Sequence, residues 1–171
     1  DLVINFDFPL AVDDYIHRLL LMKQPPESGL EPRAAWDVFG FFPAGADRVR
    51  TAVRDGMLPW WAPDELRLSF LRPVTSLTHW VDYRLWPGQP WLMHVQNLVW
   101  LGLMTWIGAR LFRAICGATW EGGMAALLFA LDPAHGMPAG WVANRNALIS
   151  GCFGSLAILL YVRGRKGMRG A

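Results

Sequence analysis

Acidic, imidazole and guanidinium side chains occur at three places in the chain where they could do chemistry. The first is the adjacent pair Asp13 and Asp14, which follows the apolar and aromatic segment 4–12. Close like charges drive two carboxyl pKa values apart, so one acid can serve as a general base and the other as a hydrogen-bond or metal partner. A solvated turn or a helix cap has the same pattern. Both interpretations stay open.

The second place is the segment 72–83, which is denser in polar groups. If the segment is helical, Thr75, His79 and Asp82 lie on one face because their spacings are four and three. Arg72 precedes them, and its guanidinium is suited to a phosphate, which it binds through paired donors. The alternative is an interfacial helix whose hydroxyl groups satisfy its own N-terminus.

The third place holds His135, Asn144 and Arg145, which flank an interruption in an apolar segment. Ionisable groups at membrane depth are costly and are therefore functional candidates. A structural loop with Arg145 at the lipid headgroups is the alternative. His17, His94 and His135 lack a ligand spacing such as HExxH, so no protein metal site is predicted. The cofactors stay unknown, and a divalent metal has only weak support.

The elements that must position these residues are three apolar stretches in a chain of 171 residues. Hydrophobic residues make up 53% and charged residues 18%, whereas a soluble domain usually carries about a quarter charged residues. Residues 91–109 hold no acid, Lys or Arg. A helix of that length spans the hydrocarbon core of about 30 Å.

The second and third stretches, about 122–142 and 147–162, are less regular. Asp132 and Pro133 interrupt the second one, and proline discourages a helix before it. We therefore expect a helix that ends near Leu131, a polar re-entrant or surface loop near 132–146, and a new helix that starts near Asn144. Backbone of that kind is tolerated at membrane depth where it is buried in protein or faces water.

Basic residues follow the first and third stretches. Arg110 and Arg113 come after the first, and 163–169 is a basic tail. The positive-inside rule puts both groups on the cytoplasmic side and residues 1–90 on the extracytoplasmic side. This polarity disfavours a soluble helical interaction domain.

The net charge of +2 is too small to suggest nucleic acid. Cys116 and Cys152 are expected to be unpaired packing residues.

Residues 1–90 contain no apolar run of 18 residues, but 47–55 and the tryptophan-rich segment after it suit short surface or interfacial helices. The predicted fold is mostly α, with about three membrane helices and a large extracytoplasmic loop. Its first region, 1–90, carries the acidic pair, and its second region, 91–171, carries the membrane helices.

Three motifs keep an order and spacing that resemble the GT-C class of membrane glycosyltransferases. They are FLRPVTSLTHWVDYRLW at 70–86, ALLFALDPAH at 126–135 and GWVANRNAL at 140–148. The nearest likeness is to protein O-mannosyltransferase-like and tetratricopeptide-linked mannosyltransferase-like proteins. Their usual His-Pro is Asp132-Pro133 here. The resemblance covers about 66–150 and the acidic pair, so the chain is expected to be an N-terminal fragment of a larger protein.

The resemblance implies an integral protein of a bacterial inner membrane or its equivalent. Such an enzyme moves a sugar from a polyprenyl-phosphate donor to a hydroxyl of an acceptor protein or glycan, at the extracytoplasmic face. Asp13 or Asp14 would deprotonate the acceptor, and Arg72 with Arg145 would neutralise the lipid phosphate. The competing class is a non-catalytic membrane assembly or scaffold protein, a diverged pseudoenzyme.

Overall fold

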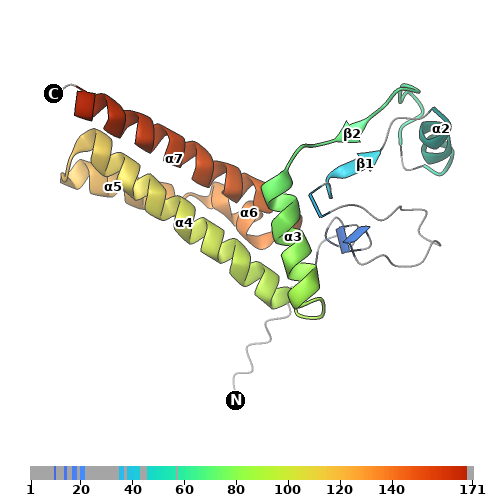
Figure 1. The fold of residues 1–171 in the computed structure, drawn as a ribbon, viewed down its shortest axis with the longest axis horizontal. Helices are drawn as coiled ribbons and strands as arrows, with labels where there is room; N and C mark the ends of the chain where they lie inside the picture. Colours follow the sequence, from blue (N-terminus) through green and yellow to red (C-terminus); the bar gives the residue numbers. More distant parts are fainter. Residues whose placement is uncertain are drawn as a thin grey trace, which may run out of the picture. The chain divides into compact units, whose positions relative to one another are not determined.

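The computed structural model describes residues 10, 14, 17–18, 20–21, 35–36, 38–42, 46–56 and 58–168. Asp13 lies outside the described residues. The chain divides into two compact units. We call residues 1–16 with 82–171 the helix unit, and residues 17–81 the strand unit. Among the described residues the structure is mostly helical, as the sequence predicts (Figure 1).

The strand unit contains two short strands that the sequence did not predict. β1 (Gly40–Phe42) pairs antiparallel with β2 (Leu68–Ser69). Between them lies α2 (Ala46–Arg54), which confirms the helix predicted at 47–55. Asp47 stands in its first turn, where a negative charge favours the helix dipole. The buried apolar side chains of this unit include Val38, Phe39, Val49 and Ala52.

α3 (Pro73–Leu85) confirms the helix predicted across Thr75–Tyr83. Proline is well suited to its first position, since a first-turn residue needs no helical N–H bond. One side of α3 is buried, and it carries the predicted polar residues Thr75, His79 and Asp82. The unit boundary falls within α3, so that Asp82 belongs to the helix unit and His79 to the strand unit.

The helix unit is built on two long helices, α4 (Pro90–Cys116) and α7 (Arg145–Met168). Both are long and apolar enough to cross a membrane. The second apolar stretch, predicted at about 122–142, forms a shorter helix: α5 (Trp120–Ala130) has 11 residues, which extend over only about 16 Å. It ends beside Leu131, as predicted, because the Asp132 carboxylate accepts a hydrogen bond from the Ala134 amide and caps the next turn.

The predicted polar loop is made of short helical turns. These are η2 (Pro133–His135), α6 (Gly136–Gly140) and η3 (Val142–Asn144). α7 then begins at Arg145, within one residue of the predicted start.

α4 and α7 run in the same direction along each other (Figure 1). At their beginnings Arg145 contacts the Met93 carbonyl, and at their ends Lys166 donates to the Ala114 carbonyl. The segment 117–144 therefore leads the chain back from the end of one helix to the beginning of the other. Both basic groups consequently lie at the same end of the helix unit, as the charge pattern predicts.

The core of the helix unit forms where these helices meet, around Met104, Ile107, Leu148, Cys152 and Leu159. Two glycines allow close approach. A Cβ at Gly108 would lie 2.8 Å from the Phe129 ring, and one at Gly151 would collide with the Met104 sulfur. Cys152 is buried and unpaired, and Cys116 is exposed and unpaired. The two cysteines therefore form no disulfide.

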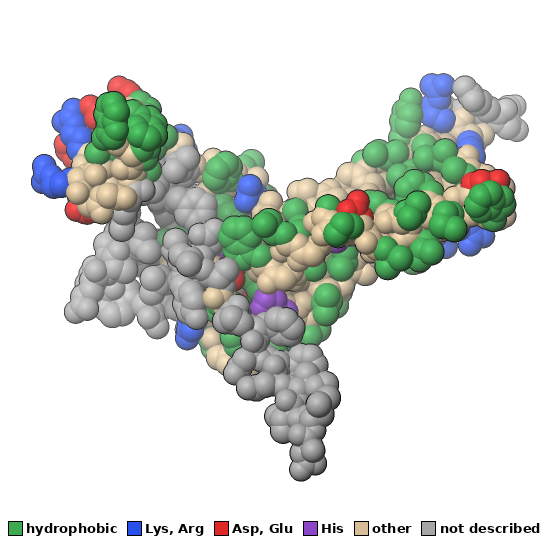
Figure 2. All heavy atoms as spheres, turned by 180° about the vertical axis from the view of Figure 1, so that it is seen from behind, with side chains coloured by type: hydrophobic (Ala, Val, Ile, Leu, Met, Phe, Trp, Pro, Cys, Tyr) green, Lys and Arg blue, Asp and Glu red, His purple; other side chains and the backbone are tan. Residues whose placement is uncertain are grey.

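The outside of α4, α5 and α7 is unusually apolar for a surface. Figure 2 shows hydrophobic side chains spread over the helix unit. Large exposed side chains include Leu98, Val99, Leu103, Trp106, Leu127, Leu128, Phe153, Ile158 and Leu160. Apolar patches of this extent mark surfaces that contact lipid or other protein, which agrees with the two possible membrane helices.

Candidate functional site

The candidate site is a buried charged cluster at the beginning of α4 and α7. We call it the Arg145 cluster and define it as Asp14, Asp82, Asn97 and Arg145. All four side chains are buried, with exposed fractions of 0–1%. They come from four separate segments of the chain, which the fold of the helix unit brings together.

Asp82 stands in the last turns of α3, where the helix presents its carboxylate to two donors. Its Oδ1 accepts a hydrogen bond from the Trp86 indole at 3.1 Å, and its Oδ2 lies 2.6 Å from Arg145 Nη1. Burial raises the pKa of Asp82 to about 6, although the attraction of Arg145 and the bond from Trp86 oppose the rise. A carboxyl group with that pKa can exchange a proton near neutral pH.

Arg145 opens α7 and has a partner for each guanidinium nitrogen. Besides the ion pair with Asp82, its Nε donates to Asn97 Oδ1 at 2.6 Å and its Nη2 donates to the Met93 carbonyl at 3.0 Å. A buried charge requires this degree of compensation, since an unpaired one would cost several kcal/mol. Within the helix unit, the guanidinium therefore holds α4 and α7 to the turn that carries Asp82.

Asp14 reaches the cluster from the far end of the sequence. Its Oδ1 accepts a hydrogen bond from the Ala143 amide at 2.6 Å, and its backbone carbonyl accepts one from the Tyr83 hydroxyl at 2.7 Å. Its charge also attracts the Arg145 guanidinium. With both acids ionised, two negative charges surround one positive charge, so the cluster has an excess of one negative charge.

Asn97 is the residue that sequence reasoning missed. Its Nδ2 donates to the carbonyls of Pro138 and Ala139, at 3.3 and 3.1 Å, while its Oδ1 accepts from Arg145. The side chain thus links α6 to the cluster. The sequence does contain a signal for Asn97: it is a polar residue within the apolar segment 91–109, and a polar group there needs partners inside the protein.

The structure distributes the predicted residues over different surroundings. Asp14, Asp82 and Arg145 meet in the Arg145 cluster. Asn144 is half-buried and is the last residue of η3, directly before Arg145 in the chain. His135 is separate, and its side chain contacts Phe129: its Nε2 lies 2.7 Å from the Phe129 carbonyl oxygen, and the ring centroids are 5.1 Å apart.

The remaining predicted residues belong to the strand unit. Buried His79 lies 5.0 Å from the His17 ring, measured between centroids, and Thr75 is buried on the same helix. The Arg72 guanidinium stacks over the Phe39 and Phe70 rings, at 5.0 and 4.8 Å. Burial, and then the nearby charge of Arg72, lower the pKa of His17 to about 4. This unit therefore carries its own group of histidines and aromatic rings.

Neither unit presents a group of three or more His, Cys, Asp or Glu side chains that could hold a metal ion, among the residues that the structure describes. No family model, curated protein or solved structure matches the chain.

Proposed function

We propose that the chain is part of a membrane glycosyltransferase that moves a sugar from a polyprenyl-phosphate donor to an acceptor hydroxyl at the extracytoplasmic face. The observation that carries the proposal is the meeting of Asp14, Asp82 and Arg145 in one buried cluster. Three segments that are distant in the chain supply these residues. Each segment was predicted from the sequence to be functional, because of its residue types or its resemblance to the GT-C class. The cluster also lies at the opposite end of α4 and α7 from the basic residues, which agrees with an extracytoplasmic site.

In the proposed reaction, a carboxylate of the pair Asp13 and Asp14 takes the proton from the acceptor hydroxyl. The hydroxyl oxygen then forms a bond to the anomeric carbon of the sugar, while the bond from that carbon to the phosphate oxygen breaks. Polyprenyl phosphate leaves with the electron pair of the broken bond. Base catalysis of this kind contributes roughly 10²–10⁴ to the rate.

The contacts of the two arginines suggest different roles for them. All three nitrogens of Arg145 have protein partners, so we propose that it positions Asp82 and Asn97. Arg72 is only half-buried, and its guanidinium carbon lies over the Phe39 and Phe70 rings. The edges of a guanidinium carry its N–H donors, so we propose Arg72 as the group that binds the donor phosphate.

The test is sugar transfer by the full-length protein in proteoliposomes that contain a radiolabelled polyprenyl-phosphate sugar and an acceptor. Asp13→Asn and Asp14→Asn are made separately, with exposed Asp55→Asn as the matched control. We expect a loss of about 10²-fold or more in one variant of the pair and none in the control. Asparagine at position 14 keeps an oxygen for the Ala143 amide, and thermal unfolding of each variant identifies any loss of transfer that comes from misfolding. Unchanged transfer in both variants would exclude the catalytic role.

A second candidate is a non-catalytic membrane assembly or scaffold protein. The contacts of all three Arg145 nitrogens with protein atoms favour it, because such contacts can hold a fold together without any substrate. If the chain is a scaffold, the wild-type protein would transfer no sugar from any polyprenyl-phosphate donor tested. Substitutions in the Arg145 cluster would nevertheless cause the protein to release its bound partner proteins.

A further inference from the structure

A cavity of about 430 Å³ lies at the ends of α4 and α7, away from the Arg145 cluster. Its lining consists of Ala114 and four cationic residues: Arg110, Arg113, Arg163 and Lys166. No acid is among them. Four positive charges around one hollow repel one another, and an anion inside the hollow would relieve that repulsion.

Two contacts fix cationic side chains of this lining. Lys166 donates through its ammonium group to the Ala114 carbonyl, in the last turn of α4. The Arg110 guanidinium stacks on the Trp106 ring, with 5.5 Å from its central carbon to the ring centroid. The first contact joins α7 to α4 beside the hollow, and the second fixes Arg110 against its own helix.

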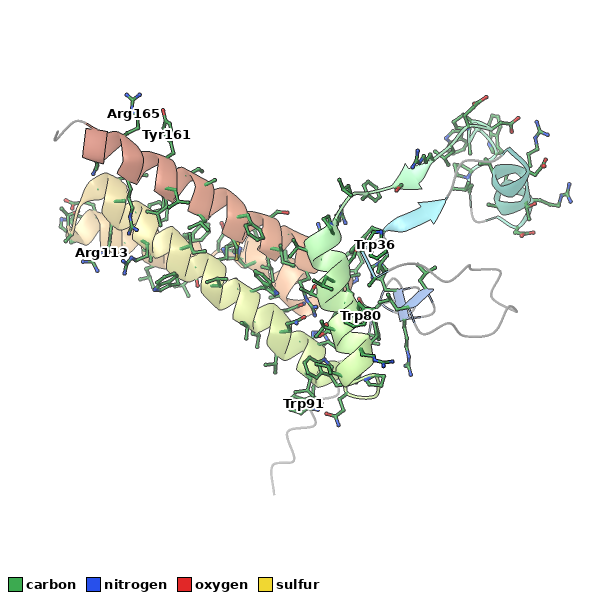
Figure 3. The ribbon with its side chains drawn as sticks, viewed as in Figure 1. Trp36, Trp80, Trp91, Arg113, Tyr161 and Arg165 are labelled. Atoms are coloured by element: carbon green, nitrogen blue, oxygen red, sulfur yellow. The ribbon has the colours of Figure 1, made fainter. Side chains whose placement is uncertain are left out.

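Aromatic residues of the kind found at a membrane interface also occur near the basic ends of α4 and α7. Trp106 and Tyr161 are both more than half exposed, with exposed fractions of 59% and 66%. Each stands one helical turn before an arginine, namely Arg110 on α4 and Arg165 on α7. Figure 3 shows Tyr161 and Arg165 projecting from the same side of α7. Tryptophan and tyrosine are enriched at the level of the lipid headgroups.

We propose that this hollow binds the phosphate of an anionic phospholipid headgroup in the leaflet beside the basic ends. Arginine binds phosphate through paired N–H donors, and Lys166 adds a point charge. The acyl chains would lie along exposed apolar side chains one or two turns nearer the membrane centre, such as Leu103 on α4 and Leu160 on α7. Because this apolar surface adjoins the hollow, a lipid fits it better than free phosphate. Basic pockets between membrane helices bind anionic headgroups in this way.

The test is thermal unfolding of the full chain in mild detergent, titrated with phosphatidylglycerol, phosphatidylcholine or inorganic phosphate. We expect phosphatidylglycerol to raise the unfolding temperature at lower concentration than phosphatidylcholine. Arg110→Gln with Arg113→Gln should weaken the apparent affinity for phosphatidylglycerol about thirtyfold. The pair Arg163→Gln with Lys166→Gln should have the same effect from the other helix. The matched control, Arg54→Gln with Arg84→Gln, removes two exposed arginines elsewhere and should change nothing.

Three results would overturn the proposal. Equal shifts with phosphatidylcholine and phosphatidylglycerol would show that the charge of the headgroup is not recognised. Inorganic phosphate that reproduces the full shift would exclude a lipid as the ligand. An unchanged affinity in both cavity variants, with wild-type unfolding in the absence of lipid, would exclude the hollow as the site. Because no sugar transfer is measured, the outcome is independent of the proposed function.

Discussion

The substitution Asp82→Asn should strongly destabilise the helix unit. Both carboxylate oxygens of Asp82 face donors, the Trp86 indole on one side and the Arg145 guanidinium on the other. Asparagine offers one acceptor oxygen, so either orientation of the amide puts N–H groups against a donor. It also removes the directly paired counter-charge of a guanidinium that is 0% exposed. Breaking a buried pair from one side costs about 3–5 kcal/mol, or about 6–20 °C in a chain of this length.

The assay is thermal unfolding of the full chain in detergent, in buffer well above the pKa of Asp82. The chain supplies a matched control of the same residue types. Arg50 and Asp64 form an exposed ion pair at 2.5 Å, with side-chain exposures of 63% and 43%. Water screens that pair, so Asp64→Asn should leave the unfolding temperature nearly unchanged. Combining Asp82→Asn with Arg145→Gln should cost less than the two single changes together, by about 0.5–3 kcal/mol.

The reasoning would be refuted if Asp82→Asn shifted the unfolding temperature no more than Asp64→Asn does. Exact additivity of Asp82→Asn and Arg145→Gln would also contradict it, because groups that pair in the folded state must show coupling. Circular dichroism of each variant at low temperature confirms that the comparison is made between folded proteins.

Three further predictions concern packing, pH and topology. Gly108→Ala should destabilise the chain by about 1–3 kcal/mol because its Cβ meets the α5 ring, whereas Gly102→Ala, with open space on the same helix, should not; thermal unfolding of both variants checks this, and equal stabilities would contradict it. The pKa of Asp82 is raised to about 6 from about 3.9 unfolded, so the folded state holds the proton more tightly. Its contribution to stability must then fall as pH rises from about 4 to about 6, and subtracting the pH profile of Asp82→Asn from that of the wild type should reveal this slope. Cysteines at positions 144 and 165, in a chain whose two native cysteines are replaced, should react with a membrane-impermeant reagent from opposite sides; labelling from one side alone would contradict the predicted topology.

The sequence predicted those parts of the fold that local chemistry determines. The Asp132-Pro133 dipeptide ends α5, and α7 begins beside Asn144, because capping and proline geometry act over a few residues. The lengths of the membrane helices were harder to predict. A hydropathy pattern records where apolar residues lie, but it does not record that α5 is only 11 residues long.

The strands β1 and β2 were missed for a related reason. They have three and two residues, too few for the alternation of polar and apolar side chains to be recognised. They form because they pair with each other across the strand unit, and that partnership is not visible in either segment alone.

The candidate site was predictable in its ionisable residues and not in its neutral ones. Asp14 was chosen for its adjacent acid, Asp82 for its spacing on a predicted helix, and Arg145 because an ionisable group at membrane depth is costly. The contributions of Asn97 and of the Met93 carbonyl depend on how α4 lies against α7. That is a property of the packed helices, so single-sequence patterns do not contain it.

The bond from the Ala143 amide to Asp14 joins residues that are 129 positions apart. During synthesis at about 5–20 residues per second, roughly 6 to 26 s separate the two residues. For that interval Asp14 has no partner at position 143, and Asp82 must likewise await Arg145. The nascent chain therefore holds acids that must stay in contact with water or the insertion machinery until α7 emerges. The cluster would then form late in folding, and only in a chain that has been synthesised into α7.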